Sequence, residues 1–248
     1  MTGRPRQSYT VAMSRHPIET PDGAPVSVII PTLNAADTLG PCLGALGEAV
    51  MDGVIRELIL VDGGSEDAIE AVADDVGAVF LKAPRGRGSQ LAAGARIAQG
   101  SWLLFLHADS VLGVGWAAAI RAHMQQTPDR AGYFRVRFQS EAQMARITAG
   151  WANLRARVFG LPYGDQGLLI SRTAYDAIGG FPEIPLMEDV ALVRRLPRRP
   201  RAIPVVIETS AERFERNGWI ARGAGNLWRL VRYLLGASPE RLAQRYDR

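Results

Sequence analysis

One buried stretch decides the fold of this chain: Leu103-Leu104-Phe105-Leu106-His107-Ala108-Asp109. Four consecutive large apolar residues predict a strand covered on both faces, as in the centre of a parallel sheet. The apolar run stops at His107 and Asp109, so two polar side chains follow the carboxyl end of the strand. Ligands of open α/β sheets bind outside those ends, where these groups could contact a ligand or a divalent metal. The alternative is that Asp109 only caps the following helix.

The preceding chain alternates strand-like and helix-like segments. Strands are predicted at 26–30, 57–61 and 78–81. A predicted helix follows each strand. The first is capped by Asp37 or Thr38 and ends at about residue 50, the second runs from Ser65 to about 75, and the third from Gln90 to 99. This βαβ alternation predicts a parallel sheet with right-handed crossovers. We therefore expect an α/β, Rossmann-type, mostly parallel sheet with helices on both faces.

Polar residues follow these strands at what should be one edge of the sheet. An Asp at this edge can accept a hydrogen bond from a ribose or base, and a neighbouring glycine allows a ligand to come close, so a nucleotide is the expected ligand. The loop 86–89 precedes a helix, which favours an anion; a flexible basic surface turn is the alternative. The candidate nucleotide-binding residues are Pro31, Thr32, Asn34, Asp62, Gly63, Arg87, Gln90, His107, Ala108 and Asp109.

The composition of the 248 residues, 47% of them hydrophobic, allows a sizeable core. The single cysteine, Cys42, excludes an internal disulfide and favours a reducing compartment. Residues 1–24 lack the apolar segment of a secretory signal and are expected to form a mobile tail. The expected location is the cytoplasm, with peripheral contact at the inner membrane face as the alternative.

The charge is uneven along the chain. Residues 1–124 hold 9 Lys and Arg against 13 Asp and Glu, whereas residues 125–248 hold 20 against 12. A basic second half predicts an anionic partner: a phosphorylated substrate, a membrane surface or a nucleic acid. A nucleic acid is disfavoured, because the basic residues are scattered without interleaved exposed aromatic residues.

The second half predicts further elements: strands at 132–138, 168–170 and 202–209, and helices at 141–159, 172–178 and 190–196. In the first of these helices, Met144, Ile147, Trp151 and Leu154 are interpreted as a stripe facing the core. A basic amphipathic helix is predicted at 219–236. It could lie on an anionic membrane, close over a site or pair with a second subunit, but packing back onto the domain is favoured.

Three motifs follow one another along the first half of the chain: Val28-Ile29-Ile30-Pro31-Thr32-Leu33-Asn34, Leu60-Val61-Asp62-Gly63-Gly64-Ser65-Glu66-Asp67 and Phe105-Leu106-His107-Ala108-Asp109. In this order they resemble the GT-A nucleotide-diphospho-sugar glycosyltransferases of family two. His107 replaces the first Asp of the family's Asp-x-Asp, and Asp109 matches the metal-contacting carboxylate. Further along, Gly179-Gly180-Phe181-Pro182, Glu188-Asp189-Val190 and Arg194-Arg195-Leu196 resemble the family's acceptor side.

The resemblance implies a domain at 25–210, with a nucleotide-binding half (25–125) and an acceptor half (126–210), followed by a helical extension at 211–248. Past residue 210 the resemblance is limited to a subgroup of small soluble family members. These share the His-Ala-Asp motif, and some of them are labelled for arsenosugar biosynthesis. It implies an inverting, Mg²⁺- or Mn²⁺-assisted transfer of a sugar from a nucleotide-diphospho-sugar to the hydroxyl of a small-molecule or lipid-linked acceptor.

Site roles follow from the same resemblance. Asp109, with His107, would hold the metal, and Asp189 would be the general base, with Glu188 as the fallback. The expected acceptor and sugar pocket contains Tyr163, Gly164, Asp165, Gln166, Arg194 and Arg195, although the two arginines could equally form a solvated helix end. Two alternative functions stay open: a non-catalytic nucleotide-sugar-binding protein, and a nucleotidyltransferase. Peripheral membrane contact or homodimerisation through 211–248 is the remaining partner hypothesis.

Overall fold

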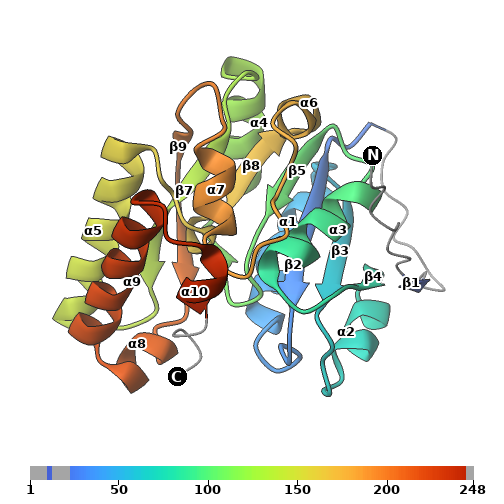
Figure 1. Cartoon of the computed structure of the whole chain (residues 1–248). Helices are drawn as coiled ribbons and strands as arrows, with labels where there is room; N and C mark the ends of the chain where they lie inside the picture. The colour runs from blue at the N-terminus through green and yellow to red at the C-terminus, as the bar shows by residue number, and fades with distance from the viewer. Residues whose placement is uncertain (1–9, 13–22, 244–248) are drawn as a thin grey trace, which may run out of the picture.

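The computed structural model describes residues 10–12 and 23–243 and contains one nine-stranded sheet, in the order β1-β4-β3-β2-β5-β8-β7-β9-β6 (Figure 1). The strands are β1 (Thr10–Ala12), β2 (Val26–Thr32), β3 (Ile55–Asp62), β4 (Val79–Lys82), β5 (Trp102–Phe105), β6 (Val111–Leu112), β7 (Gly132–Phe138), β8 (Leu168–Ser171) and β9 (Arg201–Thr209). The helices are α1 (Gly40–Met51), α2 (Ile69–Asp75), α3 (Arg87–Ile97), α4 (Trp116–Gln126), α5 (Gln143–Phe159), α6 (Arg172–Ala177), α7 (Glu188–Val193), α8 (Glu212–Asn217), α9 (Trp219–Leu234) and α10 (Pro239–Ala243), with a 3-10 turn at Gly164–Gln166.

The expected α/β fold is confirmed, and its parallel part lies in the first half of the chain. Strands β4, β3, β2 and β5 are parallel neighbours. Strand β8 runs antiparallel between β5 and β7, and β9 is parallel to β7. The second half of the sheet is therefore mixed. Its strands are connected by turns and short helices as well as by crossover helices.

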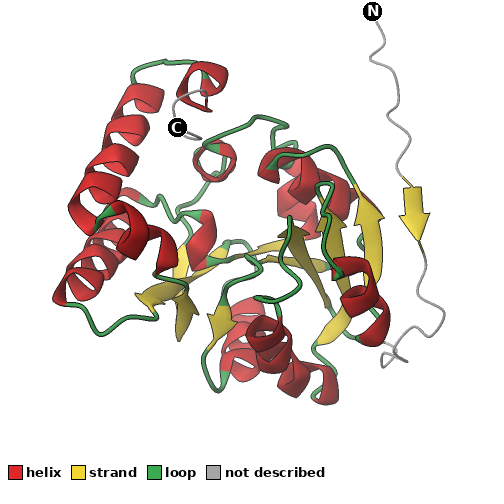
Figure 2. Cartoon of the chain, turned by 90° about the horizontal axis from the view of Figure 1, so that it is seen from below, coloured by secondary structure: helices red, strands yellow, loops and turns green. Residues whose placement is uncertain are grey.

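Helices cover both faces of the sheet (Figure 2). Alternating residues of β2 point to opposite faces, as the two-residue period of a strand requires. Val28 and Ile30 lie in a core shared with α1, α2 and α4, whereas Ile29 lies in a second core shared with α3, α6 and α7. The central strands are thus buried on both faces, as the continuous apolar runs predicted.

Several helix starts differ from the sequence-based expectation. Helix α2 begins at Ile69 rather than at Ser65, because the Ser65 hydroxyl donates to the Asp62 carboxylate and fixes a turn. Helix α1 begins at Gly40, and α3 begins at Arg87 rather than at Gln90. Asp109 does not cap α4: the short strand β6 intervenes, and the N-cap residue is Gly115.

The predicted core-facing stripe of α5 is wrong. Ile147, Trp151 and Leu154 are 55%, 45% and 49% exposed. The buried face of α5 consists mainly of alanines, of which Ala152 belongs to the main core. Alanine brings the helix close to strand β7, and the larger apolar residues therefore point outwards.

The segment after residue 210 packs back onto the domain, as favoured. Leu230 of α9 and Leu242 of α10 are buried together with Leu186, Met187 and Val190. No described helix combines the length and the hydropathy that crossing a bilayer requires. Within the expected tail, 1–24, residues 10–12 form β1, antiparallel to β4, and the rest up to residue 22 lies outside the described residues.

Gly88→Ala should destabilise the protein by about 1–3 kcal/mol, the usual cost of overpacking. A Cβ at Gly88 would lie 2.4 Å from the Pro182 carbonyl oxygen and 2.9 Å from that of Ile184, so α3 and the loop before α7 would have to separate. The matched control is Gly44→Ala in α1, where a Cβ meets nothing within 4 Å. Denaturant unfolding should show the control at wild-type stability or above; equal losses in both variants would contradict this packing.

Candidate active site

The carboxyl end of β5 opens into a solvent-connected cavity of ≈ 860 Å³, a volume that includes open solvent. His107 and Asp109 line it from this end of the sheet, and Arg87 lines it from the first turn of α3. Glu188 and Asp189, at the start of α7, line it from the second half of the chain. Residues from both halves of the chain therefore share one cavity, and the two carboxylates singled out by the sequence, Asp109 and Asp189, both face it.

Arg87 connects the two sides of this cavity. Its Nη1 lies 3.2 Å from His107 Nε2, and its Nε lies 3.5 Å from Glu188 Oε1. Because a guanidinium only donates, His107 Nε2 must accept, which places the ring proton on Nδ1. Burial, followed by the positive charges of Arg87 and Arg213, lowers the pKa of His107 to about 3. His107 is therefore a neutral imidazole at physiological pH.

The paired carboxylates after Met187 differ in their surroundings. Glu188 is only 4% exposed, and burial together with the charge of Asp189 raises its pKa to about 7, which Arg87 partly opposes. Asp189 is more open: its Oδ2 accepts from Gly164 N–H at 2.9 Å and its Oδ1 from Val190 N–H at 2.7 Å. Met187 adopts a left-handed conformation (φ 66°), uncommon for a residue with a side chain. These contacts fix the direction in which Asp189 points.

The 3-10 turn at Gly164–Gln166 forms a further wall. A Cβ at Gly164 would lie 2.5 Å from His107 Nε2, so only glycine allows this approach. Asp165 lines the cavity, burial raises its pKa, and its Oδ1 has no hydrogen-bond partner. Tyr163 lies against the guanidinium of Arg155, 3.3 Å from the ring centre, and burial raises its pKa to about 12.

A second polar cluster lies beside the cavity, where β2 and β3 end. Asp62 accepts from Gly64 N–H and Ser65 N–H, both at 2.9 Å. Gln90 Nε2 donates to the Thr32 and Val61 carbonyls. The loops after the two strands are thereby held together. Gly63 N–H also donates to the Thr32 carbonyl, and Glu66 N–H donates to Asn34 Oδ1. Pro31 pairs with Val61 in the sheet.

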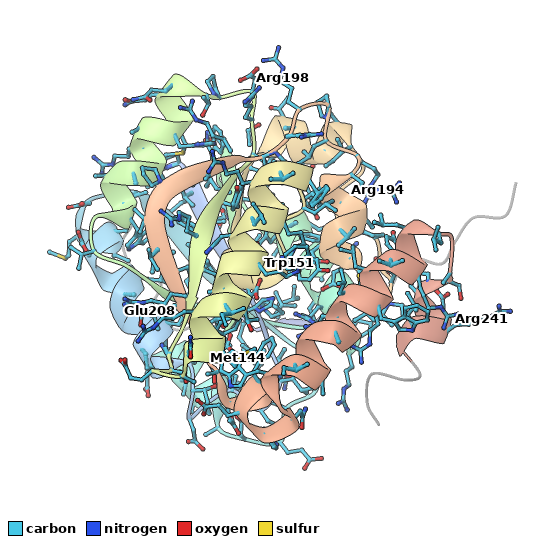
Figure 3. All side chains as sticks on the ribbon, turned by 90° about the vertical axis from the view of Figure 1, so that its left-hand side faces the viewer. Met144, Trp151, Arg194, Arg198, Glu208 and Arg241 are labelled. Carbon is cyan, nitrogen blue, oxygen red and sulfur yellow. The ribbon has the colours of Figure 1, made fainter. Side chains whose placement is uncertain are left out.

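The six residues of this second cluster (Pro31, Thr32, Asn34, Asp62, Gly63 and Gln90) lie outside the cavity lining, and so do four further predicted site residues. Ala108 packs against the main core. Gln166 is fully buried and its amide contacts Arg155, Phe134 and Asn153, so it holds the turn in place. Arg194 is exposed at the surface (Figure 3), and Arg195 donates to the Ile178 and Gly180 carbonyls after α6.

Other arginines, which are not among the residues expected from the sequence, line the cavity instead. They are Arg213 of α8 and Arg222 and Arg229 of α9, together with Asn226. The spacing 222, 226 and 229 puts three polar residues on one face of a helix, which is the signal that could have identified them. The cavity thus combines four carboxylates with arginines from α3, α8 and α9.

The donor set fits a divalent metal held jointly with a substrate. No group of three or more His, Cys, Asp or Glu side chains among residues 10–12 and 23–243 could hold an ion alone. Mg²⁺ sites of phosphate substrates do not need such a cage, because one or two carboxylates, substrate phosphates and water suffice. Asp109 supplies one carboxylate, and the unpartnered Oδ1 of Asp165 is a second free oxygen in the same cavity. His107 Nε2 is already engaged by Arg87.

A doubly covered α/β sheet with a polar cavity at the carboxyl ends of its strands belongs to the class of α/β folds that bind their ligands, nucleotides among them, at this edge. The family model for glycosyl transferase family 2 matches residues 27–175, more than half of the sequence. The chain therefore belongs to glycosyltransferase family 2.

Part of the chain is similar in sequence to two mycobacterial glycosyltransferases. The PGL/p-HBAD biosynthesis glycosyltransferases of Mycobacterium tuberculosis and Mycobacterium bovis are 37% identical over 93 residues. That match spans 35% of this chain and 36% of each relative, so about a third of either protein is compared.

Solved structures share the fold. S. aureus TarS in complex with UDP-GlcNAc superposes with a TM-score of 0.56 at 13% identity, over 75% of this chain and 58% of that one. Glucosyl-3-phosphoglycerate synthase from M. tuberculosis, in complex with Mn²⁺ and UDP-glucose, superposes with a TM-score of 0.53 at 18% identity, over 76% of this chain and 70% of that one. At these identities the likeness establishes the GT-A fold.

The raised pKa of Glu188 predicts a pH-dependent stability difference. The folded protein holds this proton up to about pH 7, whereas the unfolded chain releases it near the ordinary 4.5. Stability of the wild type relative to Glu188→Gln should therefore fall as the pH rises from 4.5 to 7, by on the order of 3 kcal/mol, and then level off. Urea unfolding at several pH values measures this difference. Parallel profiles would show that the Glu188 pKa is not raised.

Proposed function

We propose that the chain is an inverting glycosyltransferase that moves a sugar from a nucleotide-diphospho-sugar to an acceptor hydroxyl. The observation that carries this proposal is that Asp109 and Asp189, from the two halves of the chain, line one cavity. Family membership supports transfer of a glycosyl group, and the UDP-sugar complexes of the two structural relatives support a nucleotide-sugar donor.

In this proposal the nucleoside binds at the ends of β2 and β3, against Thr32, Asn34 and Asp62. The diphosphate then extends towards Asp109 and the arginines of the cavity, since guanidinium groups pair well with phosphate oxygens. Arg87, Arg213 and Arg229 line the cavity. A bound Mg²⁺ or Mn²⁺ at Asp109 would supply positive charge to the leaving diphosphate.

Asp189 is the proposed general base. Glu188 is nearly buried and ion-paired with Arg87, whereas Asp189 is more open and held in place by two backbone N–H groups. Asp189 takes the proton from the acceptor hydroxyl, whose oxygen attacks the anomeric carbon as the bond to the diphosphate breaks. A single displacement with one base inverts the anomeric centre. Asp165 lines the same cavity and would orient the sugar or the acceptor.

Asp189→Asn should lower turnover by about 10²–10⁴-fold, the usual contribution of a general base, with little change in donor affinity. Asp75→Asn, an exposed site on α2, is the matched control and should keep full activity. Donor hydrolysis, or transfer to an acceptor found by screening, measures the rate, and NMR of the product should show inversion. Retention of configuration, or full activity in Asp189→Asn, would refute this role.

Asp109→Ala should abolish the strengthening of donor binding by metal. In the wild type we expect Mn²⁺ to tighten UDP-glucose or UDP-GlcNAc binding by at least about tenfold, because Asp109 would hold the ion and its positive charge would attract the diphosphate. Isothermal titration calorimetry with Mn²⁺ and with EDTA measures the effect, and Asp75→Ala is the control. An equal Mn²⁺ effect in Asp109→Ala would exclude Asp109 as the metal ligand. Donor binding without any slow hydrolysis would instead favour a non-catalytic binding protein.

A further inference from the structure

Helix α9 has its polar face inwards and its apolar face outwards. Arg222, Asn226 and Arg229 line the active-site cavity. On the opposite side of the helix the large apolar side chains face solvent: Ile220 is 73% exposed, Trp228 62% and Leu235 82%. An amphipathic helix on the surface of a globular protein normally turns its apolar side to the core. The apolar side chains on the outer side of α9 are therefore not buried against the described part of the protein, although apolar helix faces usually are.

Helix α5 repeats this arrangement. Ile147, Trp151, Leu154 and Val158 follow each other at steps of four, three and four residues, which places them on one face. All four are exposed, from 45% to 55%. The alanines of the opposite face are buried instead. Two neighbouring helices thus present apolar stripes to the outside.

The two stripes form one continuous surface. Trp151 of α5 and Leu227 of α9 line the same groove between the helices, and Figures 1 and 3 show α5 and α9 side by side. We call this surface the α5–α9 face. Its members are Ile147, Trp151, Leu154, Val158, Phe159, Ile220, Leu227, Trp228, Val231, Leu234 and Leu235. Apolar patches larger than scattered single residues mark protein or membrane contacts.

The charge of the α5–α9 face selects the kind of partner. Helices α5 and α9 contain no Asp or Glu. Of their arginines, Arg155 is buried and Arg222 and Arg229 line the cavity, which leaves Arg146, Arg157 and Arg232 for the outer side. Arg146 and Arg157 are exposed on α5, and the Arg232 guanidinium of α9 lies 6.0 Å from the centre of the Trp228 ring. In a twofold dimer through this face, arginines would meet arginines, because both copies present the same surface. Exposed Trp and Leu beside arginine suit the boundary between headgroups and acyl chains of an anionic bilayer.

We propose that the α5–α9 face docks on the surface of an anionic lipid bilayer. The apolar side chains enter the boundary region, and the arginines contact lipid phosphates. Because the inner side of α9 lines the cavity, docking places the active site one helix away from the bilayer. Docking itself does not require the transfer reaction proposed above, so either proposal can fail without the other.

Vesicle co-sedimentation of the full chain tests this docking. The probes are vesicles of phosphatidylcholine alone, and vesicles in which about a third of the lipid is phosphatidylglycerol. The wild type should bind the anionic vesicles at least about tenfold more tightly than the neutral ones, and added salt should weaken the binding. No binding to anionic vesicles would overturn the proposal.

The decisive variant is the double substitution Trp151→Glu with Trp228→Glu, which should lower binding to anionic vesicles by at least about tenfold. The matched control is Met51→Glu with Val114→Glu, because these residues are 88% and 95% exposed outside the α5–α9 face and the charge change is the same. Circular dichroism checks that both variants fold. Equal binding by the two double variants would overturn the proposal. Light scattering gives a further test. A dimeric wild type together with a monomeric Trp151→Glu/Trp228→Glu variant would assign the α5–α9 face to a second copy of the chain and would overturn the docking proposal.

Discussion

The contact of Arg87 with both His107 and Glu188 is the interaction on which the site depends. The guanidinium lies between a neutral imidazole and a buried carboxylate, each of which comes from a different half of the chain. Without this cation, Glu188 would be a buried acid beside Asp189 with no opposing charge, a costly arrangement. Arg87 therefore holds the start of α7, and with it Asp189, against the end of β5.

A second constraint is the close packing around the 3-10 turn. Gly164 approaches His107 and gives its N–H to Asp189, and the buried Gln166 fixes the turn to β7 and α5. The direction of the proposed base is thus set by a glycine and an amide that do not react themselves. Preorganisation of this kind keeps a catalytic group in position before substrate binds.

Helix α9 joins two regions that the sequence suggests only separately. Its inner face adds Arg222 and Arg229 to the cavity, and its outer face continues the apolar surface of α5. A change on one side of this helix is only one helix diameter from the other, about 10 Å. The second, basic half of the chain accordingly contributes positive charge both to the cavity and to the exterior.

The sequence by itself determined the parallel half of the sheet, because continuous apolar runs such as 103–106 specify strands buried on both faces. It also determined which polar residues follow those strands, including Asp62 and Asp109. Only the tertiary structure decided which arginines enter the cavity: Arg213, Arg222 and Arg229 do, whereas Arg194 and Arg195 do not. The physical reason is that periodicity identifies the apolar face of a helix but not what covers it. For the same reason the stripe of α5 was expected in the core and lies outside, since small alanines allow the closer packing against β7.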